Sequence, residues 1–145
     1  MIFYAVIDTN VIVFSFIKED SLPNRIINMA LDGPIIPLLN DEILREYREV
    51  LIRNEFGLTE EVVQRFISGL EKKAIFLDRS LTDEVFTDSD DVVFYEIVLT
   101  ARETEEAYLI TGNKKHFPSK PFVVTPREML EIINKEANKN APESN

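Results

Sequence analysis

The sequence contains no cysteine and no tryptophan, and its 145 residues include only one histidine and four glycines. Without cysteine the chain forms no disulfide scaffold, iron–sulfur site, thiolate zinc site or cysteine nucleophile. A single histidine excludes a polyhistidine metal site. A bound metal therefore needs oxygen ligands, as magnesium, manganese and calcium do.

Basic side chains are also scarce, with 16 Lys and Arg against 26 Asp and Glu and a formal net charge of −10. This balance argues against nucleic-acid binding through a broad basic surface, but it leaves room for an acidic pocket that collects cations. The apolar run Ile2–Ile7 ends at Asp8, which is too early for a signal peptide or a membrane span. We therefore expect a cytoplasmic protein that does not use a membrane.

Apolar runs of strand length alternate with helical patterns along the chain. This alternation predicts the α/β class, as a three-layer α/β/α sandwich around a parallel, roughly five-stranded sheet. Residues 1–135 are expected to form one domain and residues 136–145 a polar, disordered tail. The predicted strands span 2–7, 35–39, 74–77, 108–110 and 122–124, and the predicted helices span 24–31, 41–53, 59–70, a segment capped by 88–90 that ends at 101, and a segment that begins at 126.

Polar residues directly follow two of these strands. Asp8 ends the first strand, and Thr111 and Asn113 follow the strand over 108–110. In open parallel sheets ligands bind outside the carboxyl ends of the strands, so Asp8 is either a metal ligand or the cap of the next helix. Thr111 and Asn113 either orient a metal-bound water or belong to an ordinary loop.

Two predicted helices add carboxylates. Glu46 borders the apolar stripe of its helix, and Asp91 lies in a helix that is apolar almost all round. A carboxylate turned toward a core must be paired or bind a cation, although Glu46 can also extend to solvent. Asp90 is explained equally well as a residue at a helix N-terminus. Lys114 and Lys115 either meet phosphates or form an exposed pair of charges, and His116 is more typical of a surface or packing position.

The chain resembles the PIN-domain ribonucleases, and among them the toxin components of toxin–antitoxin modules. The resemblance extends from Phe3 to about Ile133 and rests on five blocks in a fixed order: residues 6–12 (VIDTNVI), 44–56 (LREYREVLIRNEF), 88–94 (DSDDVVF), 109–113 (LITGN) and 124–130 (VTPREML).

The resemblance implies a metal-dependent endoribonuclease in which Asp8, Glu46 and Asp91 hold one or two Mg²⁺ or Mn²⁺ ions. Asp90 matches an acid that the subfamily shows beside the third ligand and shares this role. Asn113 stands where relatives carry an aspartate, so this chain has one negative charge less. Asn10, Thr111, Lys114 and Lys115 are expected to position water or bind substrate, and Arg45 and Arg48 to add affinity.

We thus predict hydrolysis of single-stranded RNA by the toxin of a toxin–antitoxin pair, with an antitoxin protein and a second copy of the chain as expected partners. A catalytically weakened module that acts through protein binding is the alternative, and Asn113 motivates it. A small metal-dependent phosphohydrolase is a third reading, but Asn10 occupies the place of its usual second aspartate.

Overall fold

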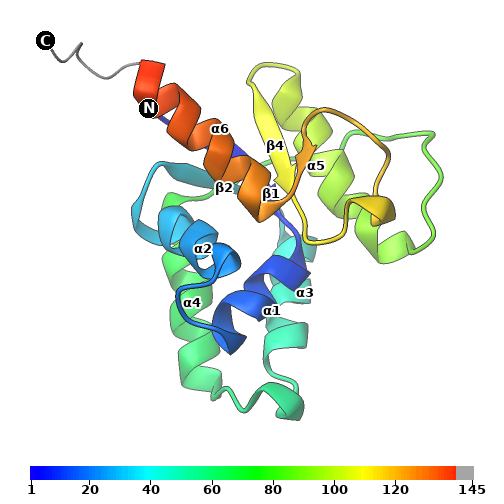
Figure 1. The fold of residues 1–145 in the computed structure, drawn as a ribbon. Helices are drawn as coiled ribbons and strands as arrows, with labels where there is room; N and C mark the ends of the chain where they lie inside the picture. The colour runs from blue at the N-terminus through cyan, green and yellow to red at the C-terminus, as the bar shows by residue number, and fades with distance from the viewer. Residues whose placement is uncertain (140–145) are drawn as a thin grey trace, which may run out of the picture.

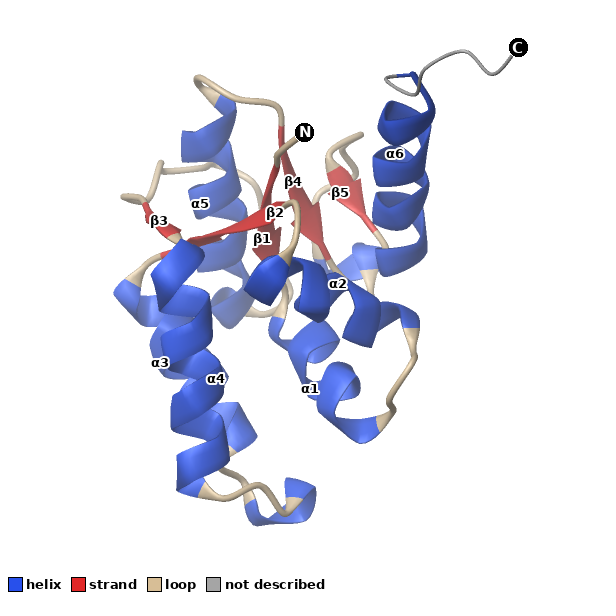
Figure 2. Ribbon diagram, turned by 90° about the vertical axis from the view of Figure 1, so that its left-hand side faces the viewer, coloured by secondary structure: helices blue, strands red, loops and turns tan. Residues whose placement is uncertain are grey.

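The computed structural model describes residues 1–139 and contains a five-stranded sheet in which every neighbouring pair of strands is parallel. The strand order is β3-β2-β1-β4-β5, and the sheet occupies the middle of the molecule (Figure 2). This confirms the predicted parallel α/β sheet. The strands are β1 Phe3–Ile7, β2 Ile35–Leu39, β3 Ile75–Phe76, β4 Ala107–Ile110 and β5 Val123–Val124.

Six helices surround the sheet (Figure 1). Several begin where the sequence provides a cap: the side chains of Ser21, Asn40 and Thr59 each accept a hydrogen bond from the backbone N–H three residues later. The helices are α1 Thr9–Ile17, α2 Leu22–Asp32, α3 Asp41–Leu51, α4 Glu60–Lys73, α5 Val92–Arg102 and α6 Pro126–Lys139, with short 3₁₀ turns η1 Asn54–Phe56, η2 Ser89–Asp91 and η3 Lys114–His116.

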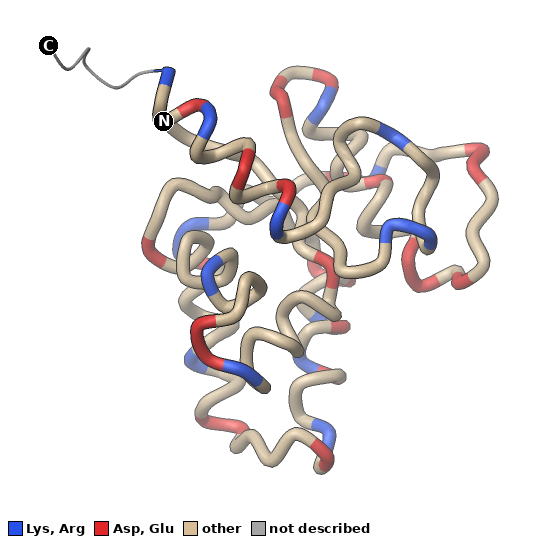
Figure 3. The backbone as a smooth tube through the Cα atoms, viewed as in Figure 1, with Lys and Arg blue, Asp and Glu red and all other residues tan. Residues whose placement is uncertain are grey.

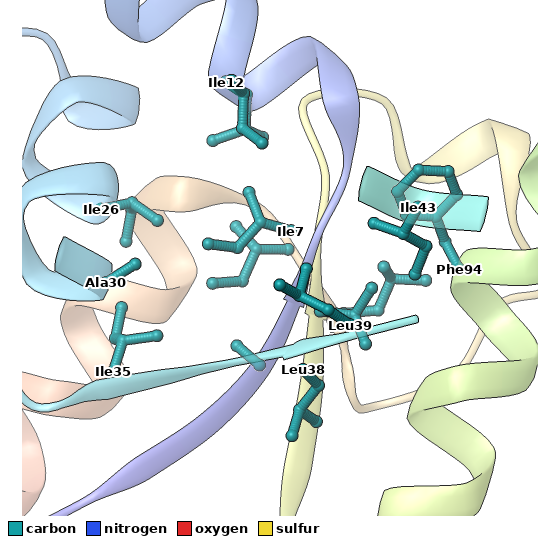
Figure 4. Packing of buried hydrophobic residues seen from close by; sticks show 14 of the residues in the cluster. Ile7, Ile12, Ile26, Ala30, Ile35, Leu38, Leu39, Ile43 and Phe94 are labelled. Carbon is teal, nitrogen blue, oxygen red and sulfur yellow. The ribbon is translucent and has the colours of Figure 1, made fainter. Parts of the chain in front are cut away.

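The hydrophobic core lies on both faces of the sheet. Ile26 and Ala30 of α2 pack on one side of the strands, and Phe94 of α5 packs on the other (Figure 4). The side chains of Ile26, Ala30 and Phe94 are fully buried. Helices on both faces of an open parallel sheet make the three-layer sandwich that the alternating pattern predicts.

The strand order changes direction beside β1, because β2 lies on one side of β1 and β4 on the other. At the carboxyl ends of these strands, the backbone N–H of Asp8 donates to the carbonyl of Ile110 at 2.9 Å. This hydrogen bond fixes the residues that follow β1 against those that follow β4. Such a change in strand order is where open α/β sheets place their ligand sites.

Two predictions about the chain need correction. Residues 9–17 were given no bounds as a helix, although Asp8 was considered as a helix cap, and α1 occupies these residues. The β-branched and aromatic side chains of α1 have weak helix propensity, and burial of Val11 and Ile12 overrides that propensity. The predicted tail begins too early, because α6 continues to Lys139, where good helix formers and the Lys139–Glu136 ion pair (3.7 Å) extend it. The rest of the predicted tail lies outside the described residues.

Among residues 1–139, no helix combines the length and apolar character that crossing a bilayer requires.

Candidate active site

Asp8 is the buried centre of the candidate site. It directly follows β1, its exposed fraction is 4%, and its Oδ2 accepts a hydrogen bond of 2.8 Å from the Thr111 hydroxyl. Burial raises the pKa of Asp8 above its ordinary value, while the Thr111 hydroxyl and the backbone N–H groups of Thr9 and Asn10 act in the opposite direction. Asp8 occupies the N-cap position of α1, but its side chain makes no capping hydrogen bond. The hydrogen bond from Thr111 directs the side chain toward the residue that follows β4.

Glu46 reaches the same edge from α3. Its Oε2 accepts a short hydrogen bond from the hydroxyl of Thr9 in the first turn of α1. Burial raises the pKa of Glu46, and so does the negative charge of Asp8, Asp90 and Asp91, whereas the Thr9 hydroxyl lowers it. The Glu46 carboxylate thus has the Thr9 hydroxyl as its hydrogen-bond partner on the side of the helix that the sequence predicts to face the core.

The position of α3 is fixed by the next residue in the chain. Tyr47 is 1% exposed, and its hydroxyl donates to the carbonyl of Ile7, the last residue of β1. Because Tyr47 anchors α3 to the end of β1, Glu46 is held beside Asp8. Burial raises the pKa of Tyr47 well above its ordinary value, and the charges of Asp8 and Glu46 add to this effect. Tyr47 therefore stays protonated and keeps its donor.

Asp91 completes the group of carboxylates from a third element. It is the last residue of η2 and the N-cap of α5. The sequence suggests a position inside the helix, whereas α5 begins directly after Asp91. Burial raises the pKa of Asp91 to about 6, with further contributions from the charges of Asp8 and Asp88. Its Oδ2 lies 3.8 Å from Nδ1 of His116.

Asn113 and His116 close the site above β4. The Asn113 side-chain nitrogen lies 3.1 Å from His116 Nε2, and the backbone N–H of Asn113 donates to the Thr111 hydroxyl at 3.0 Å. His116 thus contacts Asn113 through one ring nitrogen and faces Asp91 with the other. This links the residues that follow β4 to the start of α5.

The structure brings most of the predicted site residues to one edge, but it separates others. Asp90 lies close enough to influence Glu46 and Asp91 electrostatically. Asn10 is exposed on α1, and Lys115 is exposed on η3. Lys114 is instead directed to α6, where its Nζ lies 3.0 Å from Glu128 Oε1. Of the two lysines, Lys114 is therefore committed to an ion pair.

The residues of the site match a hard divalent cation in their donor chemistry, because Asp8, Glu46 and Asp91 supply carboxylate oxygens and repel one another. Within residues 1–139, however, no group of three or more His, Cys, Asp and Glu side chains is arranged to hold a metal ion. Binding by all three carboxylates therefore requires side-chain rotation from the arrangement described.

Sequence reasoning missed two partners of the carboxylates. Thr9 holds Glu46, and His116 faces Asp91. The position of Thr9, directly after Asp8, was a local indication that its hydroxyl lies near the site. The contact with Glu46 spans 37 positions in the chain, so only the packing of α1 against α3 reveals it.

Comparison with known families gives one finding: residues 4–115 match the family described as PIN domain. The matched segment extends from β1 through η3 and contains Asp8, Glu46, Asp91 and Asn113. A comparison with curated proteins gives no match.

Proposed function

The chain belongs to the PIN-domain family, whose members are typically nucleases that use divalent metal ions, and on this basis we propose that it is a Mg²⁺- or Mn²⁺-dependent endoribonuclease. The proposed reaction is hydrolysis of phosphodiester bonds in single-stranded RNA, whose backbone is open to a site at the edge of a sheet. Asp8, Glu46 and Asp91 are the proposed metal ligands, and Asp90 assists them.

One observation carries this proposal: carboxylates that follow β1, on α3 and at the start of α5 lie close together, so that the charge of Asp8 raises the pKa of both Glu46 and Asp91. Buried charges of like sign are costly unless a cation compensates them. Lys114 does not supply that compensation, because it pairs with Glu128. A divalent cation is the simplest counter-charge for such a group.

Asp8, Glu46 and Asp91 would hold the divalent cation, which would supply a lowered pKa for a water molecule and positive charge beside the phosphate. The chain's own residues provide the positioning. The Thr111 hydroxyl holds one oxygen of Asp8, and the Thr9 hydroxyl holds one oxygen of Glu46. Asn113 and His116, in contact with each other, are placed to orient water or substrate.

The proposed biological role is that of the toxin in a toxin–antitoxin pair, with an antitoxin protein as partner and a homodimer as the assembled form. A small open reading frame beside the gene would encode the antitoxin. Expression of the chain alone is expected to arrest growth, and co-expression with that neighbour is expected to restore it. Growth unaffected by the chain, when RNA cleavage is measurable in vitro, would contradict this role alone.

Cleavage of an unstructured RNA with Mn²⁺ tests the nuclease proposal. We expect the wild type to cleave internally, and Asp8→Asn and Asp91→Asn to lose at least about a hundredfold in rate, since each removes a charged ligand. Asp83→Asn, in the exposed loop before η2, is the matched control and should keep full activity. Equal rates in all four proteins would exclude the assigned site.

A weakened module that acts through protein binding is the second candidate. Two observations favour it. Asn113 is uncharged and contacts His116. Within residues 1–139, no group of three or more His, Cys, Asp and Glu side chains is arranged to hold a metal ion. Titration calorimetry separates the two candidates. Mn²⁺ binding with a millimolar or tighter Kd supports the nuclease, whereas the absence of both binding and a thermal shift supports the module.

A further inference from the structure

A cleft lies beside the carboxylates of the candidate active site. A cleft of about 290 Å³ separates α3 and the residues after it from the start of α5, and Arg45, Glu46, Arg53, Arg79, Ser89 and Asp90 are among the residues that line it. Glu46 and Asp90 also belong to the candidate active site. The cleft is therefore continuous with that site, and a chain bound at the carboxylates has a path along α3.

Arg79 forms one wall of the cleft and is already engaged. Its Nε lies 2.6 Å from Oε1 of Glu96, which is 3% exposed, and its Nη1 lies 2.8 Å from Oε2 of Glu42. Arg79 thus ties the loop before η2 to both α5 and α3. Its charge is matched by two carboxylates, so we assign it a structural role.

Arg45 and Arg53 line the same cleft in a different state. Both side chains are exposed, and within residues 1–139 no hydrogen bond or ion pair engages either guanidinium. Glu49 also lines the cleft but forms no ion pair with Arg45. Basic and acidic positions are interleaved along α3 and the segment after it (Figure 3). In a chain of net charge −10, two guanidiniums without partners beside a carboxylate site are well placed to receive an anion.

We propose that Arg45 and Arg53 bind backbone phosphates of the RNA strand on one side of the cleaved bond. This inference rests on the proposed nuclease function. A guanidinium presents two parallel N–H donors that match phosphate oxygens, and the cleft has room for a short segment of backbone. The strand thereby runs from the carboxylates along α3.

The other basic residue of α3 provides a contrast. Arg48 is directed to α4, where its Nη1 donates to Gln64 Oε1 at 2.7 Å, and it is not among the residues that line the cleft. Substrate affinity is therefore divided unequally among the three arginines of this region. The matched control is the Arg25→Gln/Arg65→Gln double variant, which also removes two exposed positive charges, one from α2 and one from α4, at positions that do not line the cleft.

The test is binding of a fluorescent single-stranded RNA, measured by anisotropy in EDTA so that no cleavage occurs. We expect the Arg45→Gln/Arg53→Gln double variant to bind about ten- to a hundredfold more weakly than wild type. The slope of log affinity against log salt should decrease by about 1.4, or about 0.7 for each lost phosphate contact. The Arg25→Gln/Arg65→Gln control should remain within about twofold of wild type.

Cleavage with Mn²⁺ supplies the second readout. The Arg45→Gln/Arg53→Gln variant should raise KM about tenfold and leave kcat within about twofold, because the arginines contact a part of the strand that does not react. If wild type cleaves RNA and the Arg45→Gln/Arg53→Gln variant matches the Arg25→Gln/Arg65→Gln control in affinity, salt slope and KM, the inference fails while the nuclease function stands. If wild type neither binds nor cleaves RNA, the nuclease function fails. Loss of binding to an acidic peptide, with RNA binding unchanged, would assign the cleft to a protein partner and overturn the inference.

Discussion

The electrostatic cost of Asp91 gives a direct prediction about stability. Its pKa is about 6 in the folded chain against 3.8 for an unperturbed carboxyl group, and its side chain is 15% exposed. At 1.36 kcal/mol for each unit of pKa, this difference amounts to about 3 kcal/mol. The folded state holds the proton more tightly, so the free energy of unfolding contains this contribution in full below pH 4 and loses it between pH 4 and pH 6.

The Asp91→Asn variant removes this titration and keeps the shape of the side chain. We compare the free energies of unfolding of the variant and of wild type at each pH. The value for the variant minus that for wild type should be larger at pH 7 than at pH 4 by up to about 3 kcal/mol. Urea unfolding in EDTA at pH values from 4 to 7.5 measures both curves. The pKa values of Asp8 and Glu46 are also raised, so the variant should keep a weaker decline in the same direction.

Two controls make this prediction sharp. Asp83→Asn changes an exposed aspartate in the loop before η2, and its pH profile should follow wild type. Mn²⁺ at one hundred times its Kd should add about 2.7 kcal/mol to wild type at pH 7, and less to Asp91→Asn. Parallel stability curves for wild type and Asp91→Asn from pH 4 to pH 7.5 would refute the reasoning.

Three further predictions concern the contacts made by Lys73, Arg79 and Thr111. Lys73→Met should lower the free energy of unfolding by about 1–3 kcal/mol in urea, because the Lys73 ammonium donates to three backbone carbonyls at the end of α2 and the start of β2; an unchanged midpoint would contradict this. Arg79→Met should lower the free energy of unfolding by about 3 kcal/mol, since it leaves the buried Glu96 without its cation. In the same assay Arg65→Met, which removes one partner of an exposed ion pair, should lower it by less than about 0.5 kcal/mol. Thr111→Val removes the hydroxyl that donates to Asp8 and should raise the pKa of Asp8 further, measured by NMR titration of the carboxyl carbons; a pKa that stays the same or decreases would be the contrary result.

The sheet could be predicted from the sequence because its strands are short apolar runs between turn signals. Residues 3–7 and 35–39 are buried on both faces, so their composition alone distinguishes them from surface segments. The helix α1 could not be predicted in the same way. Its side chains favour strand locally, and only packing against α2 and α3 makes it a helix.

The acids of the candidate site were proposed from the family resemblance, and the sequence around them supports the choice because each acid conflicts with its surroundings. Asp8 ends a buried strand, and Glu46 borders an apolar stripe. The partners of these acids depend on contacts between distant segments, such as the 103 positions that separate Asp8 from Thr111. The roles of the basic residues were equally hidden: Lys114 pairs with Glu128, whose backbone and side chain form a capping box with Thr125 at the start of α6.

Crystals soaked in Mn²⁺ provide the most direct test of the central claim, because anomalous scattering locates the ion. The account predicts an ion in contact with carboxylate oxygens of Asp8, Glu46 and Asp91, with side chains rotated from the arrangement described here. The Asp8→Asn protein soaked in the same way should show that ion lost or strongly reduced. A wild-type crystal with no Mn²⁺ at these carboxylates, at concentrations that support RNA cleavage, would contradict the account.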